Sequence, residues 1–182
     1  MAGKAPVKGN LYLVGFMGAG KSTVGRLLAR KLKRRFMDTD NLIEKKARMP
    51  ISKIFARRGE SGFRKLEAAV LRGVCRESGR IVSLGGGAVL RRANRALLKK
   101  TGVTVYLAIT PAEIARRLRR QGRARPLLPK RANGAPDLRK LAALLKQREP
   151  FYRAADLTLP ARPGLSAAAA ASAIARKLSR LL

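Results

Sequence analysis

The stretch Gly15-Phe16-Met17-Gly18-Ala19-Gly20-Lys21-Ser22 fits the complete pattern G-x-x-x-x-G-K-[ST] of a phosphate-binding loop. Residues 11–14 before it are an apolar run of strand formers, and residues 23–32 after it carry apolar side chains at helical spacing. A glycine-rich turn that matched the pattern by chance would not need a strand and a helix on its two sides. The stretch therefore predicts a phosphate-binding loop between a strand and a helix.

Each residue type in this loop has a physical reason to hold a nucleotide. The small residues let backbone N–H groups turn toward an anion, and the helix that follows presents the positive end of its dipole. Lys21 can reach the β and γ phosphates, and Ser22 can offer its hydroxyl to Mg²⁺. The predicted nucleotide-binding residues of the loop are Gly18, Ala19, Gly20, Lys21, Ser22 and Thr23.

Length and composition predict one cytoplasmic domain. The chain has 182 residues, which is enough to bury a core. No apolar run approaches the roughly 20 residues of a membrane span, and residues 1–8 lack the apolar core of a secretory signal. The single cysteine, Cys75, is expected to be a small buried hydrophobe rather than a nucleophile. Because histidine is absent, any proton transfer must use a carboxylate, a lysine, a tyrosine or water.

The charge of the chain is strongly one-sided. Lysine and arginine number 42 against 10 acidic residues, which gives a formal net charge of +32. A field of this sign attracts nucleic acid and other polyanions without any specific recognition. A surface biased or engineered toward supercharge fits this composition, and so does compositional drift. The acids gather in one stretch of the chain, where five of them lie: Asp38, Asp40, Glu44, Glu60 and Glu67.

Strand-like and helix-like segments alternate along the whole chain. Strands are expected at residues 10–14, 36–37, 81–84, 103–107 and 155–159. Helices are expected to about residue 33, in pieces from 41 to 79 broken at Pro50 and around Gly59 and Gly62, and at 90–100, 111–120, 137–148 and 165–182. This alternation predicts a three-layer α/β fold around a parallel sheet.

Two carboxylates follow the second predicted strand, at the edge where open parallel sheets bind their ligands. Of Asp38 and Asp40, one can hold Mg²⁺ beside Ser22, and the other can accept a proton from an attacking hydroxyl. The alternative for Asp40 is a structural one, because an aspartate at this point can cap the N-terminus of the next helix.

Two further features are candidates for a substrate site. Arg64 and Glu67 lie one helical turn apart, so the carboxylate can orient the guanidinium, although a surface ion pair has the same spacing. The glycines of residues 85–87 end the third predicted strand and allow close backbone approach to a ligand, although a plain tight turn would also use them. The segment 116–136, dense in cations and helix breakers, is typical either of a flap that closes over phosphates or of a solvated basic loop.

Taken together, these blocks resemble the shikimate kinases, in the nucleoside-monophosphate-kinase-like branch of P-loop proteins. The resemblance runs from about Asn10 to the C-terminus and rests on the loop 15–23, residues 36–40 with Ile43 and Glu44, residues 51–55, Gly59 and Glu60 with Phe63, Arg64 and Glu67, and residues 83–88, 125–128 and 148–153. It implies a five-stranded parallel sheet in the order 2-3-1-4-5. It also implies a substrate-binding helical insertion at about residues 40–79 and a lid at about residues 119–136.

The same resemblance implies ATP-dependent phosphorylation of the 3-hydroxyl of shikimate, giving shikimate 3-phosphate and ADP. The implied substrate-binding residues are Asp40, Arg64, Gly85, Gly86, Gly87 and Arg148, with both arginines on the carboxylate of shikimate. Asp40, Lys21 and Arg125 are the implied catalytic residues, and Ser22 and Asp38 the implied Mg²⁺ ligands. Glu67 would orient Arg64, and Arg162 would lie near adenine with one arginine of residues 116–120.

One departure and two rival functions remain. Arg48 stands where the family pattern usually has glycine. A gluconate-type kinase is disfavoured by Arg64, Arg148 and the triple glycine. A non-catalytic, supercharged kinase-like module that binds nucleic acid non-specifically has no positive support, since aromatic residues make up 4% of the chain and tryptophan is absent. We expect a monomer that binds ATP and shikimate, without specific nucleic acid or a membrane.

Overall fold

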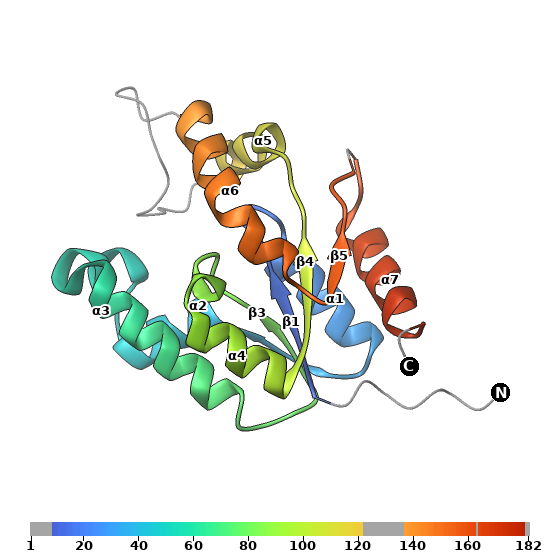
Figure 1. Ribbon diagram of the computed structural model, residues 1–182, viewed down its shortest axis with the longest axis horizontal. Coiled ribbons are helices and arrows are strands. Elements are labelled where there is room, and N and C mark those ends of the chain that lie inside the picture. The colour runs from blue at the N-terminus through green and yellow to red at the C-terminus, as the bar shows by residue number, and fades with distance from the viewer. Residues whose placement is uncertain (1–8, 122–136, 163, 181–182) are drawn as a thin grey trace.

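The computed structural model describes residues 9–121, 137–162 and 164–180. Its five strands are β1 (Asn10–Val14), β2 (Arg35–Asp38), β3 (Arg80–Ser83), β4 (Gly102–Leu107) and β5 (Leu157–Leu159). All neighbouring strands are parallel, and their order is β2-β3-β1-β4-β5 (Figure 1). The predicted sheet order is therefore confirmed.

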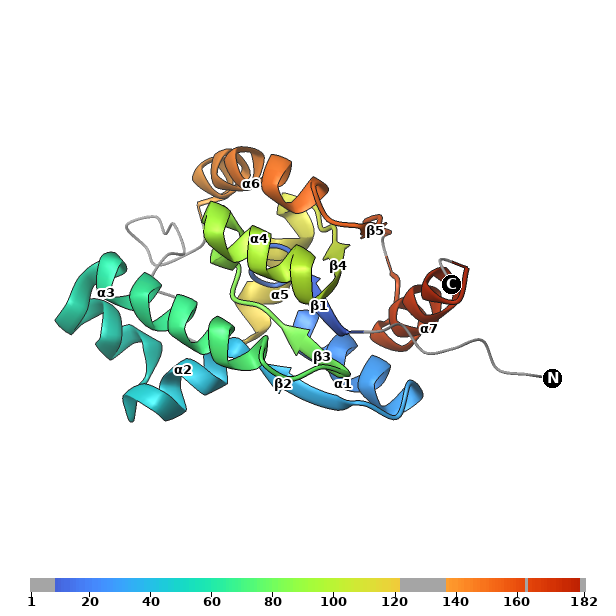
Figure 2. The same ribbon diagram turned by 60° about the horizontal axis from the view of Figure 1, so that its bottom comes forward.

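Helices cover both faces of this sheet. They are α1 (Lys21–Lys31), α2 (Thr39–Ala47), α3 (Ile51–Val74), α4 (Arg92–Thr101), α5 (Pro111–Gln121), α6 (Leu138–Arg153) and α7 (Ala167–Leu178), with a 3₁₀ turn, η1 (Ala88–Leu90), before α4. Figure 2 shows α1 and α7 below the sheet and α4 and α6 above it. In the same view α2 and α3 extend beyond the β2 edge. The three-layer α/β arrangement is confirmed.

The centre of the sheet is buried on both faces. All five residues of β1 are buried, and Leu11, Tyr12 and Leu13 have no exposed surface. Covering helices on two faces explain why this strand is a continuous apolar run rather than an alternating one. Cys75 lies beside this core and is only half-buried, with Sγ 3.2 Å from the Tyr12 hydroxyl. Cys75 thus packs against the core as expected of a small hydrophobe, but it is partly rather than completely buried.

Several features of the helices and strands differ from the expected ones. Pro150 lies inside α6, which continues to Arg153 instead of ending before the proline. The continuation buries Tyr152 completely, so packing favours helix beyond the lost N–H of the proline. Gly62 lies within regular helix, and only Gly59 interrupts α3, with φ 62° and ψ −174°. The start of α4 at Arg92 is two residues later than expected, because the 3₁₀ turn η1 comes first.

Arg48 is the C-cap of α2 and has a left-handed backbone, with φ 52° and ψ 31°. Its N–H bonds the carbonyls of Glu44 and Lys45, which closes the end of the helix. The turn that glycine would allow is therefore kept by an arginine. No helix in the described ranges is long and apolar enough to cross a membrane.

Candidate active site

The phosphate loop lies between β1 and α1, at the carboxyl edge of the sheet (Figure 1). Gly20 is the N-cap of α1 and has φ 89°, a conformation that favours glycine. No described side chain caps this helix, so the first N–H groups of α1 are left for an anion. The geometry fits the predicted phosphate site.

The ammonium group of Lys21 lies across this loop. Its Nζ donates hydrogen bonds to the carbonyl oxygens of Gly15 at 2.8 Å and Phe16 at 3.0 Å. Only 9% of the residue is exposed. A buried cation held by neutral carbonyls is well placed to bind a phosphate oxygen, which is a stronger, charged acceptor.

Ser22, Asp38 and Asp40 are linked by two hydrogen bonds, which decide which aspartate caps the next helix. The Ser22 hydroxyl donates to Asp38 Oδ2 at 2.6 Å, while Asp38 Oδ1 accepts from the backbone N–H of Asp40 at 3.0 Å. Asp38 is therefore the N-cap of α2, and the alternative that Asp40 caps this helix was wrong. Asp40 lies in the first turn of the helix instead.

The triple glycine after β3 lies between these acids and the helical insertion. A Cβ added at Gly85 would lie 2.8 Å from Asp40 Oδ1 and 2.9 Å from Glu67 Oε1, so the two carboxylates flank this glycine from opposite elements. A Cβ at Gly87 would overlap the guanidinium of Arg64. The turn is present, since Ala88 N–H donates to Gly85 O, but close packing of functional side chains also requires glycine here.

Arg64 is held by two carboxylates of its own helix. Its Nη1 donates to Glu67 Oε2 at 2.8 Å and its Nη2 to Glu60 Oε1 at 3.0 Å. Glu67 is 1% exposed, so the alternative of a bland surface ion pair was wrong. Burial raises the pKa of Glu67, although the Arg64 guanidinium opposes that shift. Glu67 Oε1 accepts no hydrogen bond from any described residue.

Arg148 brings a second guanidinium to the site from α6. The residue is 8% exposed, and its guanidinium carbon lies 5.8 Å from the centre of the Phe16 ring in the phosphate loop. Among the described residues no carboxylate forms an ion pair with it. A buried cation without a carboxylate favours an anionic ligand at this place.

A cavity of about 490 Å³ adjoins the phosphate loop. It is bounded by the loop, by the start of α5 and by the segment between β5 and α7, and its lining includes Gly18, Ala19, Gly20, Thr23, Arg117, Pro160 and Arg162. Arg117 Nη1 donates to Gly18 O at 3.2 Å, so one arginine of residues 116–120 reaches the loop. Hydrogen bonds from Arg116 and Arg117 hold the pKa of Glu113 down to about 2.

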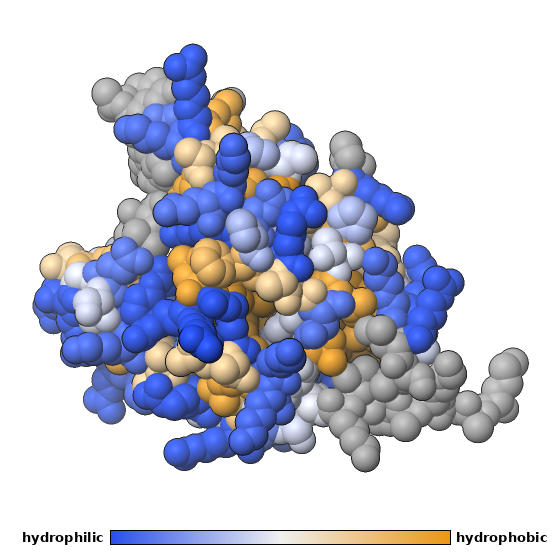
Figure 3. All heavy atoms as spheres, in the orientation of Figure 1, coloured by the Kyte–Doolittle hydropathy of each residue, from blue (hydrophilic) through white to orange (hydrophobic). Residues whose placement is uncertain are grey.

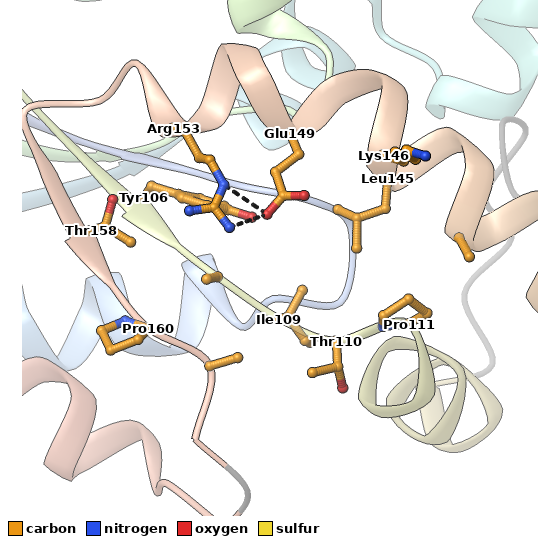
Figure 4. A pocket seen from close by; sticks show the side chains of 13 residues that line it. Tyr106, Ile109, Thr110, Pro111, Leu145, Lys146, Glu149, Arg153, Thr158 and Pro160 are labelled. Carbon is orange, nitrogen blue, oxygen red and sulfur yellow. Dashed lines mark hydrogen bonds and ion pairs between the residues drawn. The ribbon is translucent and has the colours of Figure 1, made fainter.

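A second cavity of about 430 Å³ lies between α6 and the ends of β4 and β5 (Figure 4). Tyr106, Ile109 and Leu145 line it, with the ion pair of Glu149 and Arg153 across one side. None of the predicted site residues lines this cavity. Arg125 and most of the predicted lid lie outside the described residues.

Comparisons with known proteins identify the family. The family model described as shikimate kinase matches residues 17–179, which is most of the chain. This chain belongs to the shikimate kinase family.

Relatives are similar to this chain over most of its length. The chain is 47% identical to the shikimate kinase of Geobacter metallireducens over 82% of this chain and 81% of that protein. It is 41% identical to the shikimate kinase of Moorella thermoacetica over 96% of each chain. The structure of shikimate kinase from Acinetobacter baumannii in complex with shikimate has a TM-score of 0.87 at 40% identity, covering 95% of this chain and 94% of that one.

The rival kinase is similar in fold alone. A gluconokinase from Sinorhizobium meliloti has a TM-score of 0.60 at 18% identity, covering 97% of this chain and 95% of that one. The comparisons give no support to a nucleic-acid-binding module.

In this shikimate kinase family member, the sequence analysis did not single out Tyr152, whose hydroxyl donates a hydrogen bond to Gly86 O. Tyr152 belongs to the block 148–153 of the resemblance, but the expected helix end before Pro150 concealed its helical spacing from Arg148.

Proposed function

We propose that this chain transfers the γ-phosphoryl group of ATP to the 3-hydroxyl of shikimate, giving shikimate 3-phosphate and ADP. The observation that carries the proposal is that Asp40 and Arg64 lie against the triple glycine, while Arg148 lies over Phe16 of the adjoining phosphate loop. A Cβ at Gly86 would lie 3.5 Å from Met17 N and 3.6 Å from Gly15 O, so the two loops touch. Acceptor and donor sites are therefore neighbours.

The two arginines would bind the carboxylate of shikimate. A guanidinium presents parallel N–H groups that match a planar carboxylate, and lysine has no such fork. Arg148 supports this role because it is buried without a carboxylate among the described residues. Arg64 supports it because Glu60 and Glu67 fix its orientation. Holding the ring in this way aligns its hydroxyl with the phosphate.

The remaining side chains would carry out the transfer. Asp40 holds the attacking 3-hydroxyl and takes its proton. Lys21 and the N-terminus of α1 offset the charge that develops on the transferred group. Arg125 is proposed to do the same from the lid. Arg117 and Arg162 line the cavity beside the loop, which supports a place for adenine there.

The chemistry of Ser22 and Asp38 fits Mg²⁺. A hydroxyl and a carboxylate oxygen 2.6 Å apart are hard oxygen ligands, and Mg²⁺ is usually held by one or two such side chains together with substrate phosphates. When bound, the ion supplies positive charge at the phosphates. Binding would replace the hydrogen bond between the two side chains, while Asp38 Oδ1 continues to cap α2.

The test is ADP release from ATP in the presence of Mg²⁺, with and without shikimate. Release should depend on shikimate and should fall strongly for the same ring without its carboxylate. Arg148→Lys keeps the charge but loses the fork, so kcat/KM for shikimate should fall roughly ten- to a hundredfold. ADP affinity, measured by calorimetry, should stay the same. ADP release that ignores shikimate would refute the proposal.

A further inference from the structure

Tyr152 is a buried residue of α6 that the catalytic set above does not use. It has no exposed surface, and its hydroxyl donates a hydrogen bond to Gly86 O. Gly86 is the glycine that contacts the phosphate loop at Met17 N and Gly15 O. The hydroxyl therefore binds the glycine turn of residues 85–87 at the point where this turn meets the phosphate loop.

Arg148 lies on the same face of α6, one turn before Tyr152. Residues four apart on a helix are neighbours. Burial raises the pKa of the Tyr152 hydroxyl, and the nearby Arg148 guanidinium opposes that shift. This neighbourhood depends on the passage of α6 through Pro150, because a helix that ended at Arg148 would not carry Tyr152 beside it.

The tyrosine ring is fixed from its other side. It stacks on the ring of Tyr106 from β4, with centroids 5.4 Å apart and planes 23° from parallel. Burial raises the pKa of Tyr152 to about 12, so the hydroxyl keeps its proton at neutral pH. Tyr152 is thus a permanent donor in a single position.

We propose that Tyr152 is a positioning residue for the phosphoryl transfer: its hydroxyl fixes Gly86 and Arg148 relative to each other and to the phosphate loop. It does not touch the reacting atoms. It sets the distance between the guanidinium that binds the substrate carboxylate and the loop that binds the phosphate. The inference rests on the proposed function, because it assigns Tyr152 a role within that same site.

Tyr152→Phe removes this one hydroxyl and keeps the stacked ring. One lost hydrogen bond to a positioned group corresponds to about a tenfold loss, so kcat/KM for shikimate should fall about tenfold. ADP affinity should change less than about twofold, because the described nucleotide cavity does not include Tyr152. Calorimetric titration with ADP counts the competent sites, so kcat is expressed per folded molecule.

Tyr106→Phe is the matched control. It removes a hydroxyl from the other ring of the same stack, in a residue that lines the second cavity (Figure 4). Its kcat/KM for shikimate should remain that of wild type. Equal losses in both variants, or wild-type kcat/KM in Tyr152→Phe, would overturn the proposal.

The ratio of kcat/KM for shikimate to that for the ring with hydroxymethyl in place of carboxylate separates positioning from general destabilisation. It should fall in Tyr152→Phe, because Arg148 then discriminates less, and stay constant in Tyr106→Phe. An unchanged ratio in Tyr152→Phe would also overturn the proposal. Failure of wild type to release ADP in response to shikimate would instead refute the proposed function.

Discussion

At the scale of single residues, Asp38 and Asp40 have the same charge but different environments. Asp38 is committed to Ser22 and to the N-terminus of α2 through its two oxygens. Asp40 follows it in the first turn, with Oδ1 against Gly85. Asp38 therefore caps the backbone of α2, and the proposed general base is Asp40.

Asp40→Asn should therefore reduce catalysis without unfolding the protein. Loss of a general base lowers kcat by about 10² to 10⁴. The melting temperature should remain near that of wild type, because Asp38 still caps α2. Asp137→Asn, at the N-cap of α6, is the control for loss of a carboxylate elsewhere. A variant that unfolds while its folded fraction turns over normally would contradict this assignment.

Arg48 holds a left-handed backbone that disfavours a side chain. Arg48→Gly should stabilise the protein by about 0.5 to 1 kcal/mol, since relief of about 1–2 kcal/mol of strain exceeds the added entropy of the unfolded chain. Urea unfolding measures the change. In Arg72→Gly, at an exposed helical position of α3, the same substitution should cost about 1 kcal/mol. Destabilisation by both variants would show that Arg48 has contacts worth more than its strain.

At the scale of elements, α3 consists of two helical segments joined at Gly59. With φ 62° and ψ −174°, this glycine has a conformation that other residues rarely adopt. Glu60 follows directly and binds Arg64 one turn later. The interruption at Gly59 therefore positions Glu60, one of the two carboxylates that orient Arg64.

Gly59→Ala tests this joint, because no atom lies within 4 Å of the added Cβ and only backbone strain changes. It should destabilise the protein by about 1–3 kcal/mol and raise the KM for shikimate. Gly73→Ala is the control, since Gly73 also has open space but lies in regular helix of α3. That substitution should stabilise by up to about 1 kcal/mol. Chemical unfolding measures the change in the free energy of unfolding, which should be a decrease for Gly59→Ala and an increase for Gly73→Ala. Equal changes in the two variants would contradict the strain argument.

At the scale of the whole molecule, charge dominates the surface. Figure 3 shows hydrophilic residues over much of the drawn face, with hydrophobic residues gathered near its centre. With 10 acids against 42 basic residues, ion pairs cannot neutralise the surface. Most of its cations therefore face solvent and mobile anions.

This charge should produce nucleic-acid binding that is weak in specificity and sensitive to salt. When counterion release drives binding, the logarithm of the affinity falls linearly with the logarithm of the salt concentration. Fluorescence anisotropy with two unrelated duplexes should give equal affinities at low salt and no binding at about 0.5 M salt, where screening is short-ranged. Heparin should compete for the same sites. Preference for one duplex that survives this salt would favour a dedicated nucleic-acid site.

Local patterns in the sequence predicted much of the fold. The loop from Gly15 to Ser22 predicted a strand, an anion site and a helix, because its glycines and its lysine serve no ordinary turn. The alternation of segments predicted the layers, and the resemblance to a family supplied the strand order. Gly59 was recognised as a break because glycine interruptions depend on the chain's own conformational freedom.

At several residues the local sequence allows two structures, and only the tertiary structure decides between them. Both Asp38 and Asp40 are good caps by type, and the contact with Ser22 selects Asp38. Pro150 is a helix breaker by type, but burial of Tyr152 carries α6 through it. Glu67 has the spacing of a surface pair, but Gly85 of the turn after β3 lies against its carboxylate, and the side chain is buried. Local sequence sets the energy of each option within its own segment, whereas contacts from distant segments decide which option has the lower total free energy.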